Sequence, residues 1–328
     1  MLHVAAVRGS RGVPAHRRRG GDLVTLPEPA LEVITARQAD LGDGMLIRRL
    51  LPSRARRTVG AWCFMDHFGP INQGGMRVGP HPHAGLQSIT WLFDGEVMHH
   101  DSLGNVQSVR PGQLNIMRAG VGMAHAEKTP ETSGGNFHGV QLWIAQPDWA
   151  RHGAPAFDHF GSLPRIMLGD AQAIIFAGGI EGHTSPAYLE SPLVGAEVLL
   201  APRGVVRIPL ERTFEHALSI IQGSVVVNGK EFLPGSVVYL GAQRDSVVVK
   251  TYAGARMMLL GGEPFEEQLF MWWNFVARSR DEIELYAKEW NAGSAFGEVG
   301  EMGLRRVPAP DFPWRATQPA GYGQPGAA

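Results

Sequence analysis

Residues 88–117 read SITWLFDGEVMHHDSLGNVQSVRPGQLNIM, and this stretch decides the fold class. Short runs of β-branched, aromatic and aliphatic side chains alternate in it with turn residues such as Pro111-Gly112. Runs of this length, bounded by Gly, Pro, Asn and Asp, are typical of β-strands. The dipeptide Asp94-Gly95 favours a hairpin after the first run. Because no helical spacing interrupts the series, the stretch predicts an antiparallel sandwich or barrel.

The same pattern continues outward on both sides of this stretch. Further apolar or alternating runs lie at residues 46–51, 61–65, 139–145, 173–177, 197–200, 205–208, 217–221, 224–227 and 236–240. The proline-containing residues 146–165 predict a domain boundary. Asn228-Gly229 predicts a hairpin in the second set. A Pro-Gly turn occurs in each set, at 111–112 and 234–235, so the two halves are predicted to repeat one β domain.

Composition narrows the class of protein. The 328 residues carry 30 Lys and Arg against 31 Asp and Glu, so the net charge of −1 provides no overall basic field for nucleic acid. The single cysteine, Cys63, excludes an internal disulfide and a cysteine-based metal cluster. No apolar run approaches the roughly 18 residues of a membrane span. We therefore expect a cytoplasmic protein that binds neither nucleic acid nor membrane.

The chain ends differ from its middle, and one helix is predicted near the C-terminus. Ser279, with Glu282 three residues later, forms a capping box that predicts a helix over about 279–291. We predict four segments: a flexible N-terminal extension (1–30), a first β domain (31–150), a second β domain with the helix (151–306) and a disordered tail rich in Pro and Gly (307–328).

Histidines mark where the chemistry lies. Seven of the 13 fall in the first domain, at residues 67, 81, 83, 99, 100, 125 and 138. Two spaced pairs stand out, His81-Pro82-His83 and His125-Ala126-Glu127. Alternate residues of a strand point to the same face, so each pair can present two ligand atoms in one direction. Two such strands facing each other would supply three imidazoles and one carboxylate, a set that a first-row divalent ion accepts.

The other histidines are weaker candidates. His67, His99, His100 and His138 could line the rim of a pocket, although a hydrogen-bonded, non-catalytic role is the preferred interpretation for each. His216 lies in the second domain, which has no comparable histidine pair, so it is interpreted as structural. A surface or core role also remains the alternative for any one of the paired histidines.

The sequence around the two pairs resembles the pirin family of the cupin superfamily. The segments that carry the resemblance are MDHFGP (65–70), GPHPHAGL (79–86), DSLGN (101–105), AGVGMAHAE (119–127) and WWNFV (272–276). The resemblance spans about residues 35–295 and implies two tandem cupin β-barrels, a bicupin, with metal in the first domain and none in the second. Carried over residue by residue, it implies that His81, His83, His125 and Glu127 bind one mononuclear iron, as Fe(II) or Fe(III).

One position departs from the family pattern. Many pirins, and most cupins, have Glu four residues after the second histidine, where this chain has Gln87. We expect Glu127 to provide the carboxylate instead, and Gln87 to hydrogen-bond a metal-bound water. The lost negative charge leaves another divalent metal as an alternative to iron.

Pirins are associated with quercetin 2,3-dioxygenase activity, which opens a flavonol ring and releases carbon monoxide. The resemblance therefore implies a dioxygenase acting on a flavonol-like, chelating substrate with O₂, and Glu127 is the candidate catalytic residue. The same family also implies an alternative: a non-enzymatic, iron-dependent redox sensor that binds a transcription factor or a metabolic enzyme. For either function, the family implies a monomer. Arg54, Arg56 and Arg57 give that alternative slight support, and a solvated loop explains them equally well. A metal-free structural bicupin would require the four ligands to be coincidental.

Two further features receive structural interpretations. Cys63 lies in an apolar run and is predicted to be buried rather than reactive. Trp272-Trp273 is predicted to pack the C-terminal segment against a barrel.

Overall fold

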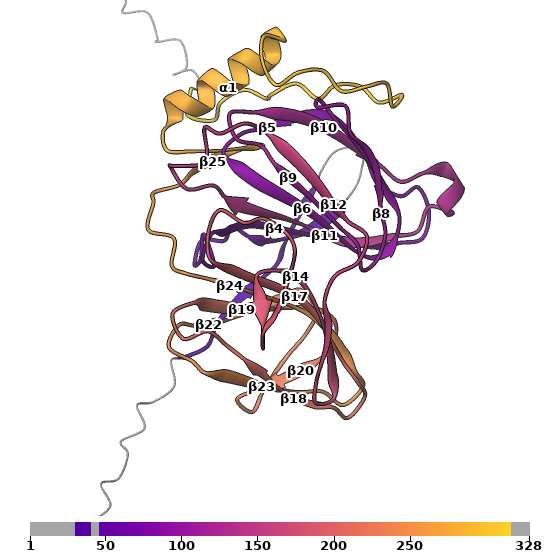
Figure 1. Cartoon of the computed structure of the whole chain (residues 1–328), viewed down its shortest axis with the longest axis vertical. Coiled ribbons are helices and arrows are strands. Elements are labelled where there is room, and N and C mark those ends of the chain that lie inside the picture. The colour runs from indigo at the N-terminus through magenta and orange to yellow at the C-terminus, as the bar shows by residue number, and fades with distance from the viewer. Residues whose placement is uncertain (1–29, 41–45, 316–328) are drawn as a thin grey trace, which may run out of the picture.

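The computed structural model describes residues 30–40 and 46–315. Two barrels lie one above the other in Figure 1, and helix α1 (Arg280–Ala292) lies across the outer end of the first barrel. The predicted all-β architecture of two tandem barrels with a C-terminal helix is therefore confirmed. The predicted flexible extension, residues 1–30, lies outside the described residues except for residue 30.

Each barrel consists of a seven-stranded sheet and a four-stranded sheet. The large sheet of the first barrel has the order β12 (Ala156–Phe160), β9 (Leu114–Arg118), β6 (Leu86–Gly95), β11 (Phe137–Ala145), β4 (Trp62–Ile71), β3 (Leu46–Leu51) and β2 (Arg37–Asp40). Its small sheet has the order β5 (Arg77–His83), β10 (Met123–Lys128), β7 (Val97–Asp101) and β8 (Val106–Val109).

The second barrel repeats this arrangement. Its large sheet has the order β1 (Glu32–Thr35), β22 (Ser236–Gly241), β19 (Glu215–Gly223), β24 (Ala255–Gly262), β17 (Leu193–Leu200), β14 (Ala171–Ala177) and β13 (Arg165–Leu168). Its small sheet has the order β18 (Val205–Pro209), β23 (Ser246–Lys250), β20 (Val225–Val227) and β21 (Lys230–Phe232). The shorter elements are the 3₁₀ turn Glu131–Ser133, the pair β15 (Gly179–Ile180) and β16 (His183–Thr184), and the pair β25 (Phe270–Trp272) and β26 (Phe275–Ala277).

The two barrels exchange edge strands, which changes the predicted domain boundaries. β1 precedes the first barrel in sequence but pairs with β22 of the second. β12 follows the predicted boundary but pairs with β9 of the first. Each added strand hydrogen-bonds backbone groups that would otherwise form an open sheet edge. The structural units therefore do not coincide with residues 31–150 and 151–306.

The two turn dipeptides behave differently. Asn228-Gly229 joins β20 to β21 as a hairpin, with both residues in the left-handed region, and this prediction is confirmed. Asp94-Gly95 does not make a hairpin, because β6 and β7 belong to different sheets. Gly95, with φ of 89°, instead turns the chain from the large sheet into the small one.

The two large sheets pack against each other and share one hydrophobic core. Trp62 and Trp91 of the first barrel pack around Phe176 of the second, with ring centroids 6.1 and 5.0 Å from it. The Trp62 indole donates to the carbonyls of Val194 and Gly261, at 3.2 and 3.0 Å. The Trp91 indole donates to the Glu197 carboxylate, at 2.9 Å. The indole groups thus satisfy their polar atoms across the barrel junction while burying large apolar surfaces.

This packing gives the central strands β4, β6 and β11 of the first large sheet two buried faces. On β6, Ile89 and Trp91 face the second barrel, whereas Ser88 and Thr90 belong to the opposite face. All nine residues of β11 are buried, which explains its nearly continuous apolar sequence. The face turned away from the second barrel is therefore available for a protected site.

The chain returns to the first barrel after β24. α1 packs through Ile283, Tyr286 and Trp290 onto a cluster that includes Ala84 and Ala124 of the first barrel. The helix therefore covers the first barrel, whereas the sequence assigned it to the second domain. Trp272 and Trp273 pack against the same cluster, as predicted. Within the described part of the chain, we find no helix with the length and apolar character needed to traverse a bilayer.

The start of α1 matches the predicted cap in part. The Ser279 hydroxyl accepts the Glu282 N–H at 3.2 Å, as expected of an N-cap residue. The Glu282 carboxylate accepts from the Arg278 N–H at 3.0 Å, instead of returning to the N-cap residue itself. One half of the capping box is therefore formed.

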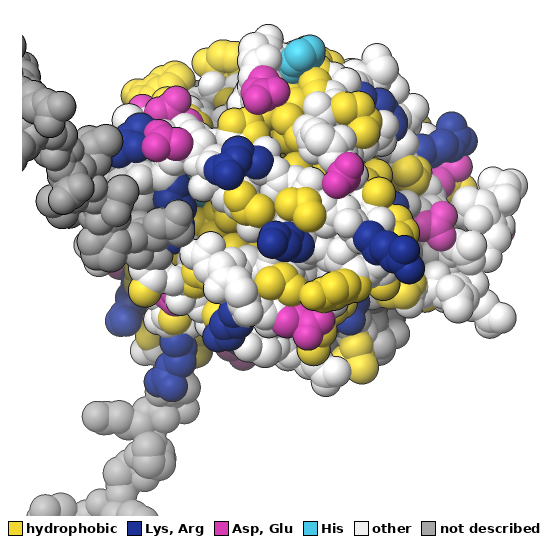
Figure 2. All heavy atoms as spheres, turned by 90° about the horizontal axis from the view of Figure 1, so that it is seen from below, with side chains coloured by type: hydrophobic (Ala, Val, Ile, Leu, Met, Phe, Trp, Pro, Cys, Tyr) yellow, Lys and Arg dark blue, Asp and Glu magenta, His cyan; other side chains and the backbone are white. Residues whose placement is uncertain are grey.

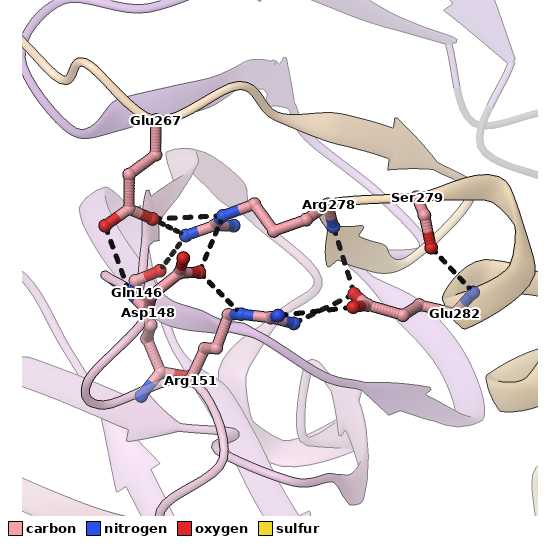
Figure 3. Close-up of polar contacts among 7 residues, drawn as sticks. All are labelled: Gln146, Asp148, Arg151, Glu267, Arg278, Ser279 and Glu282. Carbon is pink, nitrogen blue, oxygen red and sulfur yellow. Dashed lines mark hydrogen bonds and ion pairs between the residues drawn. The ribbon is translucent and has the colours of Figure 1, made fainter.

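A network of charged side chains holds this segment to the loop that follows β11 (Figure 3). Arg151 of that loop contacts Glu282 of α1 and Asp148, each at 2.8 Å. Arg278 pairs with Glu267 and with Asp148, the latter at 3.0 Å. Two arginines and three carboxylates thus link α1 to the first barrel, and their mutual contacts favour a network over isolated surface pairs.

The first residues of the predicted disordered tail are ordered against α1. Trp290 donates its indole N–H to the Val307 carbonyl at 2.8 Å, and the Val307 N–H donates to Pro80 of β5 at 2.8 Å. Asn291 accepts from the Ala309 N–H at 2.9 Å. The prediction was wrong for residues 307–315, because α1 and β5 offer hydrogen-bond partners that composition does not reveal. Residues 316–328 lie outside the described residues.

The inter-barrel indole bond generates a stability prediction. Replacing Trp91 by Phe leaves one oxygen of the buried Glu197 carboxylate without its donor, while Arg256 stays 3.0 Å from the other oxygen; an unsatisfied buried polar atom costs about 1–3 kcal/mol. We expect the free energy of unfolding to fall by about this amount in Trp91→Phe, measured by chemical denaturation. The matched control is Trp149→Phe, whose indole is 70% exposed, and it should change little. Equal effects of the two changes would contradict the interpretation.

Candidate metal centre

Three paired histidines converge on one point inside the first barrel. His81 and His83 lie on β5, and His125 lies on the neighbouring strand β10, directly opposite His81. The ligand pairs thus come from adjacent strands of one sheet, whereas we had expected two facing strands. One ring nitrogen from each residue lies within 4.8 Å of the others, and all three residues are buried.

The hydrogen bonds of His81 and His83 leave their Nε2 atoms as acceptors. His81 Nδ1 lies 2.9 Å from the Gly79 carbonyl, and His83 Nδ1 lies 3.0 Å from the Asn274 carbonyl. A carbonyl can only accept, so Nδ1 must carry the proton in each ring. The neutral imidazole then has a lone pair on Nε2, which is the atom that binds a metal.

A second chain of contacts sets the orientation and tautomer of His125. Asp101 accepts from the Leu103 and Asn105 N–H groups, at 2.9 and 3.0 Å. Burial alone would raise the pKa of Asp101, but hydrogen bonds from His99 and Asn105 lower it below its ordinary value. The carboxylate therefore accepts from His99 Nε2 at 3.1 Å, and His99 Nδ1 accepts from His125 Nδ1 at 3.3 Å.

In these tautomers, the lone pairs on Nε2 of His83 and of His125 point toward each other. The Nε2 atoms of His83 and His125 are 3.1 Å apart, and neither carries a proton in the tautomers just derived. Burial holds the pKa of both imidazoles well below the ordinary value, so a shared proton is disfavoured. A metal cation between them would satisfy both lone pairs and that of His81. The donor set therefore fits a divalent first-row metal.

Glu127 lies nearer to His99 and His125 than to the other two histidines. The strand pairing shifts register between His125 and Glu127, which displaces the carboxylate along β10. Glu127 forms a second group with His99 and His125, again within 4.8 Å. Its carboxylate accepts from the Thr90 hydroxyl at 2.6 Å, while burial raises its pKa. The four predicted ligands, together with His99, thus form two overlapping triads that share His125.

Sequence reasoning underestimated His99 and did not single out Asp101. His99 is buried against His125, rather than lying at the pocket rim. A usable signal was present, because His99-x-Asp101 has the same alternate spacing as the two pairs that were selected. It was missed because neither residue forms part of a recognised ligand pair.

The metal centre opens into a cavity of about 390 Å³ whose lining combines aromatic and aliphatic side chains with polar ones. Phe64 and Trp143 stack face to face along it, with ring centroids 3.9 Å apart. Asp66 is buried, and its carboxylate accepts hydrogen bonds from Nε and Nη2 of Arg49, at 2.8 and 2.6 Å. Burial raises the pKa of Asp66 in spite of this partner. Residues that complete the lining are Phe68, Met76, Val78, Gln141, Trp273, Asn274 and Val307, with His81, His83 and Glu127 at the base.

Gln87 does not face this cavity, which corrects our expectation. It shares the β6 face of Ile89 and Trp91, toward the second barrel, and its amide donates to the Tyr188 carbonyl at 3.1 Å. Strand alternation therefore separates it from Thr90, which contacts Glu127. Gln87 therefore belongs to the barrel junction and to neither group of potential metal ligands.

The other candidate histidines lie away from the cavity. His67 and His138 contact each other through Nε2 atoms 2.8 Å apart and pack edge-on against Phe93. His100 is half-buried, one residue from His99 on the opposite strand face. His216 is buried in the second barrel. In the described residues, both groups of potential metal ligands belong to the first barrel.

Cys63 is fully buried in β4, as predicted. Burial raises its pKa to about 12, so its thiol stays protonated at neutral pH.

Comparison with known proteins identifies the family. The family model described as Pirin matches residues 44–144, and the Pirin C-terminal cupin domain matches residues 195–297. The chain belongs to the pirin family. A Pseudomonas aeruginosa pirin relative named "putative quercetin 2,3-dioxygenase" is 44% identical over 293 residues, which cover 88% of this chain and 92% of the relative. The match to both models confirms the two cupin domains.

Solved structures support the same assignment. A quercetin 2,3-dioxygenase from Acinetobacter baumannii has a TM-score of 0.83 and 39% identity, covering 86% of this chain and 96% of its own. A bacterial pirin from Escherichia coli, in complex with nickel(II), has a TM-score of 0.58 and 17% identity, covering 72% of this chain and 100% of its own. At that identity, the second structure supports the pirin fold alone.

The contact between His99 and His125 generates a prediction about metal affinity. Replacing His99 by Gln removes the aromatic link between Asp101 and His125, and loss of such a supporting group typically costs 10–100-fold in metal affinity. We expect that loss for nickel(II) or Fe(II) in a competition titration with a chelator. His100→Gln is the matched control, because its side chain faces away from His125, and it should retain affinity. Equal affinities of the two variants would contradict this role for His99.

The His67–His138 pair generates a prediction about pH. Burial is the main cause that lowers the pKa of His67 to about 3 and of His138 to about 4, and nearby arginines add to it. The unfolded chain takes up protons below about pH 6.5, while these two folded residues remain neutral. The free energy of unfolding should therefore fall as pH decreases from about 6.5 toward 4, by up to about 1.4 kcal/mol per pH unit for each histidine.

The measurement is chemical denaturation of chelator-treated protein between pH 7 and 5. A His67→Gln/His138→Gln variant should show a shallower dependence than wild type. The control His152→Gln/His183→Gln, which changes two exposed histidines, should keep the wild-type slope. A steeper slope in the first variant would contradict the assignment.

Proposed function

We propose that this pirin is an iron-dependent oxygenase of the quercetin 2,3-dioxygenase type, acting on a planar, chelating aromatic substrate with O₂. The observation that carries the proposal is the convergence of three unprotonated Nε2 atoms beside a cavity that His81 and His83 line together with Phe64, Phe68, Trp143 and Trp273. The names of the relatives from Pseudomonas aeruginosa and Acinetobacter baumannii support the reaction class. His81, His83, His125 and Glu127 are the proposed ligands.

The cavity walls suit such a substrate. Its volume of about 390 Å³ is in the range of small-molecule sites. The stacked Phe64 and Trp143 rings offer apolar contacts to an aromatic molecule. Asp66, held by Arg49, places a hydrogen-bond acceptor on the same cavity for phenolic hydroxyls. Trp273 and Val307, from the returning C-terminal segment, limit access of water.

Bound iron would let the substrate oxygens and O₂ meet at one redox-active centre. The protein's contribution is to hold the three imidazoles as acceptors and to supply a proton carrier. We propose Glu127 for that second role, because its buried carboxylate has a raised pKa and a fixed donor in Thr90. Nickel or another divalent metal is the alternative occupant, since the histidine set does not select iron by itself.

The test combines metal analysis with gas measurements. Fe(II)-loaded protein should contain about one iron per chain and should consume O₂ and release carbon monoxide with quercetin. His81→Ala/His125→Ala should lose the iron, and its O₂ uptake should fall to the rate without protein. His152→Ala/His183→Ala replaces two exposed histidines and should keep both properties.

The results of these measurements distinguish the oxygenase from the redox-sensing regulator and test the metal centre itself. Stable iron binding without O₂ uptake across a panel of flavonols would contradict the oxygenase and favour the redox-sensing regulator. Absence of binding by iron and by nickel alike would contradict the metal centre itself.

A further inference from the structure

A second cavity lies beside the metal pocket and is lined mainly by arginines. Its volume is about 540 Å³, and its lining residues are Thr35, Arg37, Arg49, Pro52, Ser53, Arg54 and Arg57. We call it the arginine cavity. Arg49 lines both this cavity and the metal pocket, so the two are separated there by a single side chain.

Two of the four guanidinium groups, those of Arg54 and Arg57, have no acidic partner among the described side chains. Arg49 is neutralised by Asp66, through both carboxylate oxygens. Arg37 interacts electrostatically with the same Asp66 carboxyl, although it forms no ion pair or side-chain hydrogen bond with a described side chain. Four arginines line this cavity, and Asp66 is the one described carboxylate that interacts with them, so the excess of positive charge creates a local field that attracts anions.

The loop that carries two of these arginines is fixed in place. The Ser53 N–H donates to the Arg56 carbonyl at 2.8 Å, and the Arg56 N–H donates to the Ser53 hydroxyl at 2.9 Å. Arg56 itself points to the second barrel, where it pairs with Glu32 at 2.8 Å and lies 3.8 Å from the centre of the Tyr239 ring. Arg56 therefore anchors this loop to the second barrel, and Arg54 and Arg57 are not needed to hold the loop in place.

The position of the cavity follows from the exchange of edge strands. Thr35 ends β1, in the sheet of the second barrel, whereas Arg37 and Arg49 lie on β2 and β3 of the first. The cavity thus lies where the chain crosses between barrels. The indigo segment of Figure 1 is the part of the chain that makes this crossing. On the face shown in Figure 2, by contrast, Lys and Arg are scattered among acidic and apolar side chains.

We propose that the arginine cavity binds a small oxyanion with two or more negative charges, either a polycarboxylate or a phosphate compound. Guanidinium groups bind carboxylate and phosphate oxygens through paired N–H donors, and several around one hollow select for multiple charges. A concave site of this volume suits a small molecule better than an extended polymer. The site goes beyond the proposed oxygenase function and does not require a bound metal.

The test is isothermal titration of the full chain with citrate and with inorganic phosphate, at constant ionic strength. Arg37→Gln/Arg54→Gln/Arg57→Gln removes three of the four charges that line the cavity and leaves the Arg49–Asp66 ion pair intact. The matched control Arg203→Gln/Arg207→Gln/Arg212→Gln removes the same charge from exposed positions of the second barrel. We expect saturable binding near one anion per chain in wild type and control, weakened about tenfold or more in the first variant.

The two anions identify the ligand chemistry. Preference for citrate would assign carboxylates, and preference for phosphate would assign phosphate compounds; both results support the site. Equal weakening in both triple variants would overturn it, because the effect would then be one of total charge. Absence of saturable binding by either anion would also overturn the proposed site. Binding of heparin alone would overturn it as well, because it would indicate a surface for a polymeric partner. Thermal unfolding midpoints of the three proteins should agree, since all six substituted arginines are exposed.

Discussion

The packing of the two large sheets against each other is the constraint on which the rest of the molecule depends. It buries the outer face of β4, β6 and β11 under the second barrel, with Trp62 and Trp91 hydrogen-bonded across the junction. The opposite face of the same strands then becomes the inner wall of the first barrel. Strand alternation therefore assigns each residue either to the junction or to the cavity, and a shift of one position would exchange the two sets.

Burial inside the first barrel keeps the imidazoles of the metal centre neutral, and their hydrogen bonds leave the Nε2 atoms unprotonated. His81 and His83 are oriented by backbone carbonyls, and His125 is oriented through His99 and Asp101. One of those carbonyls belongs to Asn274, in the segment that returns from the second barrel. The second barrel thus contributes to the centre indirectly, because it delivers the C-terminal segment to the first.

That returning segment also closes the outer end of the first barrel. α1 and residues 307–315 cover β5 and β10 with aromatic side chains, and the network around Arg151 and Arg278 links them to the first barrel. The same crossing between barrels places β1 and the 52–58 loop at the junction, where the arginine cavity forms. Both features arise because chain order and spatial order differ at the domain boundaries.

The sequence by itself determined the strand-rich class, the two-fold repeat, the capped helix and the three histidines of the centre. These depend on local spacing, and alternate residues such as His81 and His83 share a face wherever the strand lies. Only the tertiary structure decided which strands exchange, which barrel α1 covers, that Gln87 faces the junction, and that His99 supports His125. Those outcomes depend on pairing between residues far apart in the chain, and local spacing carries no information about the partner.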